Sequence, residues 1–187
     1  TQLKNALGEF TATDEEAAEV LGEYFQEVYT REDTPSPTVD RDTAHEPFVD
    51  KVIQFDPATV ENALGRLQTN KAPGPDGLHL MLLKECAVEL SLPISKIFSE
   101  SYESGILPED WKMANISPIF KKGSRTDAAN YRPVALTAVL CKVMERIIRD
   151  KMVEYLEKNE LLSAHQHGLT RKRSYLTNLL ETFEEWT

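Results

Sequence analysis

One stretch of this sequence changes its hydrophobic period, and that change limits the fold more than any other feature. Residues 111–120 and 130–136 have the composition and pattern of strands, and the polar residues between them are typical of a turn. The stretch therefore predicts a β-hairpin with a long basic tip. Pro118 and Pro133 lack the N–H that an inner strand needs, so we expect both strands to lie at a sheet edge.

Helical patterns surround this hairpin on both sides. Thr13 and Glu16 form a capping box, and Gly105 is placed to end a helix. Ser91 and Pro93 predict a break between two helices. The expected helices cover residues 14–29, 57–68, 78–90, 92–104, 137 or 138 to 158, and 174–186. The predicted fold class is therefore α+β and mainly α-helical.

Two segments are rich in residues that interrupt regular structure. Residues 34–47 contain three prolines among polar residues, which predicts a linker and the best candidate for a domain boundary. Residues 71–77 hold two prolines and two glycines and must form turns. Asp76, inside the second segment, has the position of a cap for the helix that follows.

Charge is distributed unevenly along the chain. The 187 residues carry a net charge of −10, which taken whole argues against nucleic acid as a partner. Residues 1–70, however, hold 15 Asp/Glu against 5 Lys/Arg, whereas residues 112–173 hold 13 Lys/Arg against 6 Asp/Glu. An acidic front is thus joined to a locally basic segment that can bind phosphate groups, although solvated helix faces would give the same pattern.

The two cysteines and the apolar runs indicate the compartment. Cys86 and Cys141 lie far apart and outside any CxxC spacing, which predicts reduced thiols and an intracellular location, nuclear or cytoplasmic. No apolar run approaches the roughly 18–20 residues of a membrane span, so we expect a soluble chain without a membrane partner.

The sequence offers cations rather than catalytic groups. It contains no P-loop, GxGxxG, GxSxG or HExxH motif, and His165 and His167 have no third metal ligand nearby. We therefore expect no catalytic residue and no metal site. The hairpin tip instead gathers cations that suit phosphate oxygens, and Gly123 there permits a close backbone approach; these cations are Lys121, Lys122, Arg125 and Arg132.

Several blocks in this order resemble the N-terminal part of non-LTR (LINE-type) retrotransposon reverse transcriptases. They are KAPGPDG at 71–77, LPEDWK at 107–112, PIFKKG at 118–123, NYRPVALT at 130–137, and QHG at 166–168 followed by Arg173 and Ser174. The resemblance covers residues 71 to about 180. Residues 10–70 are more loosely similar to the linker that precedes the polymerase in such reading frames.

The resemblance implies a fold and a domain division. Residues 1–50 would be an acidic helical linker, and residues 51–187 would be the fingers and the start of the palm of a right-hand polymerase. It also implies nucleotide-binding residues, namely Lys121, Lys122 and Arg132. The residues implied to bind template or other nucleic acid are Lys71, Arg125, Gln166, Gly168, Arg171, Arg173 and Ser174.

Structural roles compete with these functional ones. The prolines and glycines of residues 71–77 are suited to shaping turns alone, and Trp111 and Tyr131 are more typical of a core than of base stacking. Leu169 stands where the family usually has Phe, a hydrophobic exchange that packing tolerates.

The family's chemistry depends on aspartates that hold two Mg²⁺ ions. The resemblance places these aspartates beyond residue 187, and no Asp-Asp pair occurs in the sequence. The parent polymerase would use Mg²⁺ and deoxynucleoside triphosphates with an RNA template and a DNA primer, together with its palm and thumb. We expect this chain alone to hold neither cofactor and to polymerise nothing.

A second hypothesis is a truncated or co-opted interaction module without catalysis. It would use the apolar face of residues 17–28 to bind a protein partner. The last expected helix is also apolar along one face, which predicts self-association when the rest of the polymerase is missing. A transposon relic without function is a third possibility.

Overall fold

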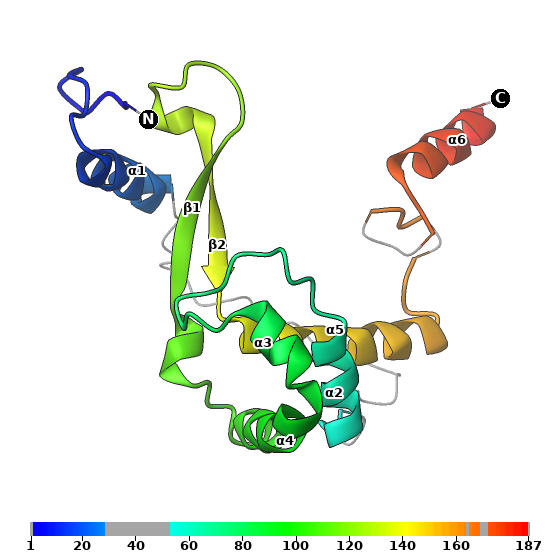
Figure 1. Cartoon of the computed structure of the whole chain (residues 1–187). Helices are drawn as coiled ribbons and strands as arrows, with labels where there is room; N and C mark the ends of the chain where they lie inside the picture. Colours follow the sequence, from blue (N-terminus) through cyan, green and yellow to red (C-terminus); the bar gives the residue numbers. More distant parts are fainter. Residues whose placement is uncertain (1, 29–52, 164, 169–171, 187) are drawn as a thin grey trace. The chain divides into compact units, whose positions relative to one another are not determined.

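A computed structural model of the chain describes residues 2–28, 53–163, 165–168 and 172–186 (Figure 1). Contacts divide these residues into two compact units. The first comprises the described residues up to 28 together with 55–143, and the second comprises 53–54 together with the described residues from 144 onward. The predicted boundary near residue 50 and the linker at 34–47 lie outside the described residues.

The described elements mix helices with one small sheet, as the predicted α+β class requires. In chain order they are α1 (Asp14–Val28), α2 (Pro57–Gly65), α3 (Leu80–Glu85), α4 (Ala87–Ser104), the 3₁₀ turn η2 (Glu109–Lys112), β1 (Ala114–Phe120), the 3₁₀ turn η3 (Ala128–Asn130), β2 (Tyr131–Thr137), α5 (Val139–Lys158) and α6 (Tyr175–Trp186). Helix α5 begins in the first unit and continues into the second. Among the helices of the described residues, none is long and apolar enough to cross a membrane.

Strands β1 and β2 form the predicted hairpin, paired antiparallel from Ala114 opposite Thr137 to Phe120 opposite Tyr131. Pro118 faces Pro133 across the ladder. The Lys121 N–H donates to the Asn130 carbonyl (2.8 Å), and hydrogen-bonded pairs alternate from there, so the two prolines form a non-hydrogen-bonded pair. Their nitrogens therefore face the outer edges, where a missing N–H costs no ladder bond.

The main core of the first unit lies where α2 packs on α4. Val60, Leu64 and Phe98 are fully buried there. Phe98 meets Phe55 and Trp111 edge to face, with ring centroids 5.6 and 5.8 Å apart. The expectation that Trp111 is a core residue is confirmed.

A second cluster of buried side chains fixes α1 beside the hairpin. Its buried members are Leu3, Ala17, Leu21, Phe25 and Ala128, and Tyr131 packs against them. The capping box of α1 forms in part. The Thr13 hydroxyl accepts from the Glu16 N–H (3.2 Å), while the Glu16 carboxylate accepts from the Ala12 N–H (2.6 Å). The apolar face expected to bind a partner is thus largely covered within the chain.

The predicted boundary between the third and fourth helices was wrong. The break between α3 and α4 falls at Cys86 instead of Ser91, and Pro93 lies inside α4. A proline inside a helix costs about 3 kcal/mol. Ile94 and Phe98 follow Pro93 in α4, and both are buried. Burying each of these side chains stabilises the fold by about 1.5–3 kcal/mol, which compensates for the cost of the proline.

The start of the first strand was also predicted too early. Residues 109–112 form a 3₁₀ turn after Pro108, and the Trp111 N–H donates to the Pro108 carbonyl (3.0 Å). A proline followed by two acidic residues is a helix-start signal, which the strand prediction overlooked.

Candidate nucleic-acid interface

The hairpin has two faces because side chains alternate along each strand. The face towards α1 carries Ile116, Pro118, Tyr131 and Pro133, which line a groove with that helix. By alternation the opposite face carries Ile119, Val134 and Arg132, and the paired extension of β1 adds Lys121 to it. The register therefore brings two of the predicted nucleotide-binding residues, Lys121 and Arg132, to one face.

Lys121 and Arg132 are both exposed, and Arg132 lies directly opposite Ile119. Lys121 lies opposite Asn130, so the two cations are diagonal neighbours, whose backbones in such ladders are about 7–8 Å apart. Within the described part of the chain, neither cation forms a salt bridge with a carboxylate. This face can therefore offer an ammonium and a guanidinium group to one anion with several oxygens.

The remaining cations of the tip lie elsewhere. Lys122 is exposed in the turn. The Arg125 guanidinium lies 4.6 Å from the centre of the Phe120 ring, a cation–π contact. The Phe120 side chain belongs by alternation to the α1 side of the hairpin, so Arg125 is separated from Lys121 and Arg132.

Hydrogen bonds from side chains to the backbone brace the tip of the hairpin. Gly123 has a φ of +89°, and a Cβ there would lie 2.7 Å from the Asn130 amide oxygen. The Asn130 amide donates to the Ser124 carbonyl (3.0 Å), and the Tyr131 hydroxyl donates to the Arg125 carbonyl (2.8 Å). The close approach expected at Gly123 is thus made by Asn130, and it shapes the loop that carries the cations.

The 71–77 segment packs against the far end of the hairpin. Gly74 is buried, and a Cβ there would lie 2.5 Å from the Thr137 carbonyl oxygen. Gly77 has a φ of +65°, and its N–H donates to the Gly74 carbonyl (3.1 Å). These two glycines therefore shape and pack the turn, which is the structural role weighed for this segment. Lys71, predicted to bind template, is exposed at the start of the segment.

Asp76 does not cap the helix that follows. Its Oδ1 accepts from the Leu78 N–H (3.3 Å), and α3 is capped by His79, whose Nδ1 accepts from the Met81 N–H (3.2 Å). A helix capped by Asp76 would begin at Gly77, whereas α3 begins at Leu80, about one turn later. The Asp76 Oδ2 is buried without a hydrogen-bond partner among the described residues.

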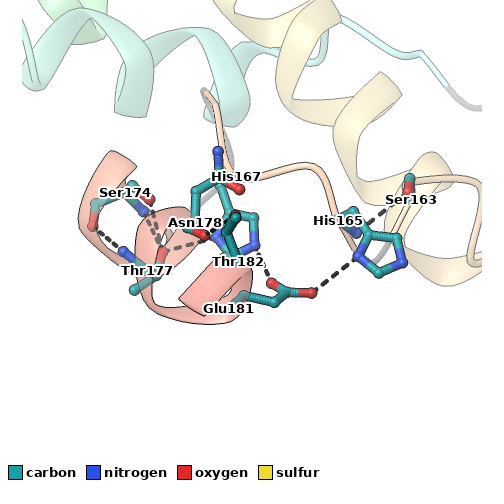
Figure 2. A network of polar contacts seen from close by, with 8 residues as sticks. All are labelled: Ser163, His165, His167, Ser174, Thr177, Asn178, Glu181 and Thr182. Atoms are coloured by element: carbon teal, nitrogen blue, oxygen red, sulfur yellow. Dashed lines mark hydrogen bonds and ion pairs between the residues drawn. The ribbon is translucent and has the colours of Figure 1, made fainter. Parts of the chain in front are cut away.

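In the second unit a polar network joins the 166–168 loop to α6 (Figure 2). The buried His167 ring contacts the Thr177 hydroxyl through Nδ1 (2.8 Å) and the Glu181 carboxylate through Nε2. His165 Nδ1 lies 3.0 Å from the other oxygen of Glu181. The hydrogen bond from His167, and after it that from His165, holds the pKa of the Glu181 carboxyl below its usual value.

Thr177 connects the His167 ring to the start of α6. The Thr177 hydroxyl donates its one hydrogen to the Ser174 carbonyl (2.8 Å) and accepts from the Ser174 N–H (2.9 Å). His167 Nδ1 contacts the same hydroxyl and Nε2 contacts the Glu181 carboxylate, so the ring links the loop to two positions of α6.

Other residues of this unit that were predicted to bind template have local partners. The Gln166 side-chain amide donates to the Gly168 carbonyl (2.9 Å) and closes the loop on itself. The Ser174 hydroxyl accepts from the Thr177 N–H (3.3 Å) at the start of α6. Arg173 is exposed, and Arg171 lies outside the described residues.

Sequence reasoning missed the role of His167. It weighed the histidines as metal ligands, but 14 residues separate His167 from Glu181, and no local motif links them. The described residues contain no group of three or more His, Cys, Asp or Glu side chains that could hold a metal ion. Within the part of the chain that the structure describes, no cluster therefore fits the Mg²⁺ ions that a polymerase uses.

No protein-family model matches the chain. Over 118 residues it is 32% identical to "Probable RNA-directed DNA polymerase from transposon X-element" of Drosophila melanogaster. The matched region covers 63% of this chain and 13% of that relative. It is also 33% identical over 113 residues to "RNA-directed DNA polymerase from mobile element jockey" of the same fly, covering 58% and 12%. A third relative, "Probable RNA-directed DNA polymerase from transposon BS", is 29% identical over 116 residues, covering 62% and 13%.

The chain thus spans about 13% of the length of these relatives. The predicted resemblance to the RNA-directed DNA polymerases of non-LTR retrotransposons is confirmed.

Proposed function

We propose that this chain is the fingers region of an RNA-directed DNA polymerase, and that the Lys121–Arg132 face of its hairpin binds the triphosphate of the incoming deoxynucleotide. The observation that supports this most is the register, which puts an ammonium and a guanidinium on one exposed face. The names of the relatives supply the polymerase context.

The chemistry of the two side chains suits this role. The Arg132 guanidinium can donate two parallel hydrogen bonds to phosphate oxygens, whereas Lys121 acts as a point charge. Lys122 lies next to them in the turn and can add a third cation. The hydrogen bonds that brace the tip reduce the entropic cost of ordering this loop when a ligand binds.

Template contacts are assigned to the other predicted residues. Lys71 and Arg125 belong to the first unit, whereas Gln166, Gly168, Arg171, Arg173 and Ser174 belong to the second. Proton and phosphoryl chemistry would come from the parent polymerase, so we expect no primer extension by these 187 residues. An intracellular location, nuclear or cytoplasmic, is part of the same proposal.

Binding of a fluorescent deoxynucleoside triphosphate to the purified chain tests the nucleotide role. Arg132→Ala and Lys121→Ala should each weaken binding at least about tenfold, because each removes a charged contact worth about 1.5–3 kcal/mol. Arg146→Ala removes an exposed cation from α5 and serves as the matched control. Equal affinities for all the variants would refute the assignment.

Salt dependence tests the nucleic-acid role separately. Affinity for an RNA–DNA primer–template should fall steeply between about 50 and 200 mM salt, and each lost phosphate contact should lower the slope by about 1. An affinity independent of salt, or robust primer extension by the chain alone, would contradict the proposal.

The apolar face of α6 supports the expected self-association. Leu176, Leu179, Leu180 and Phe183 are each about half exposed along it. Sedimentation of the chain should show a monomer–dimer equilibrium that Leu180→Glu shifts to monomer. A wild-type chain that stays monomeric at high concentration would refute this.

A further inference from the structure

A groove of about 650 Å³ lies between α1 and the hairpin, within the first unit. Helix α1 packs inward through Ala17, Leu21 and Phe25, and the neighbouring row of its side chains faces the groove. Most of the lining is apolar or small; it comprises Leu3, Asp14, Ala17, Ala18, Leu21, Gly22, Phe25, Gln26, Ile116, Pro118, Tyr131 and Pro133.

Small residues on α1 keep this groove open. Ala18 and Gly22 stand one turn apart on the row that lines it, and no heavy atom lies within 4 Å of the place where a Gly22 Cβ would be. Across the groove, Ile116 is 48% exposed. Glycine inside a helix costs roughly 0.5–1 kcal/mol relative to alanine. Gly22 therefore lowers the stability of α1 at a position that lines an apolar groove.

By helical spacing, acidic side chains of α1 follow the row that lines the groove and form its rim. Glu15, Glu19 and Glu23 are exposed and form the row next to Ala18 and Gly22 on the helix. Helix α1 contains no lysine or arginine. This rim repels the phosphates of nucleic acid and attracts cations, so an occupant complementary to it has an apolar surface flanked by Lys or Arg.

The hairpin argues for a helix as occupant instead of an added strand. A peptide strand that joins a sheet edge needs free main-chain donors along that edge. Pro118 and Pro133 remove the donor from the middle of both outer edges. Helix-in-groove binding needs no such donors, only an apolar seam that accepts one helix face.

We propose that this groove docks a basic amphipathic helix of a partner protein. The apolar side of that helix lies on Ala18, Gly22 and Ile116, and its lysines or arginines meet Glu15, Glu19 and Glu23. This binding is independent of the Lys121–Arg132 face, so Arg132→Ala should leave it unchanged. Failure of one proposal can thus be told apart from failure of the other.

Fluorescence anisotropy with a labelled 18-residue Leu/Lys amphipathic peptide tests the proposal on the full chain. Gly22→Leu adds a side chain to the row that lines the groove, at a position where the Cβ meets no heavy atom within 4 Å, and it should weaken binding at least tenfold. Gly65→Leu is the matched control, because Gly65 ends α2, also has open space around it, and does not line the groove. It should change the affinity less than twofold.

Charge reversal provides the second test. The double variant Glu19→Lys with Glu23→Lys should lose the Leu/Lys peptide and gain a Leu/Glu peptide of the same pattern. Equal binding of a scrambled Leu/Lys peptide, or no effect of Gly22→Leu, would overturn the proposal. Displacement of the peptide by a short RNA would also overturn it, because the surface would then be a nucleic-acid site.

Discussion

Replacing Gly74 by alanine should destabilise the first unit, because the added methyl group would meet backbone atoms. The new Cβ would lie 2.5 Å from the Thr137 carbonyl oxygen and 2.8 Å from the Ala138 Cα. Ordinary contact begins near 3.4 Å, so the Thr137 contact must open by about 0.9 Å. Thr137 is held in the β-ladder opposite Ala114, and Ala138 is fully buried, so neither can retreat freely.

The expected cost follows from these constraints. Overpacking a well-packed site costs about 1–3 kcal/mol, and a clash with backbone belongs near the top of that range. The reduced freedom of the unfolded chain returns about 0.4–1 kcal/mol. The net loss of about 2 kcal/mol in the free energy of unfolding corresponds to a fall in Tm of about 4–8 °C for a chain of this size.

Urea unfolding followed by Trp111 fluorescence measures this loss where it occurs. Trp186→Phe removes the second of the two tryptophans, so the signal then reports the core of the first unit alone. Gly65→Ala is the control, because its Cβ meets no atom within 4 Å, and its stability should stay equal or rise by up to about 1 kcal/mol. If the Gly74 and Gly65 variants unfold at the same urea concentration, the steric reasoning is wrong.

Three further outcomes are expected. His167→Ala should speed amide hydrogen exchange in α6 more than His165→Ala does, because only the buried His167 ring bridges the loop to two positions of the helix; equal effects would contradict the bridge. The depressed pKa of Glu181 means that its stabilising contribution is complete above the usual value of 4.5 and is lost as the pH falls below it. Exchange in α6 should therefore rise on acidification through that range, and Glu181→Gln should abolish the step. Asp56→Ala should cost about 1 kcal/mol in urea unfolding, because Asp56 accepts from the Thr59 N–H (2.9 Å), whereas Asp56→Asn should retain most of the cap.

The sequence was informative wherever local signals agreed with one another. Helix α1 begins one residue after Thr13, as its capping box predicts, and α5 ends at Lys158, as its apolar stripe predicts. The hairpin followed from the change in period, and its edge prolines were correctly interpreted. These features depend on neighbouring residues, so a single sequence contains them.

Tertiary packing decided what the sequence could not. The proline at 93 looks like a helix break, and only the burial of Ile94 and Phe98 shows why α4 continues past it. The apolar face of α1 looked available to a partner until Leu3 and Ala128 were seen to cover it. No periodicity in α1 reveals which other segment supplies that cover.

The candidate site divides in the same way. The tip cations were visible in the sequence, and the resemblance selected Lys121, Lys122 and Arg132 among them. Placing Lys121 and Arg132 on one face, with Arg125 stacked on the other, required the strand register. The His167–Glu181 contact joins a loop to a later helix, a docking that neither segment encodes by itself.

Helix α5 limits where the chain can be divided for expressing the first unit alone. Its first five residues, 139–143, belong to the first unit, where Val139, Cys141 and Val143 are buried, and its remaining residues belong to the second. Isolated helices shorter than about 12–15 residues are marginal in water, so a stub of little more than one turn would not persist after a cut at that boundary. Expressing the first unit with an intact core therefore requires carrying α5 to its end at Lys158.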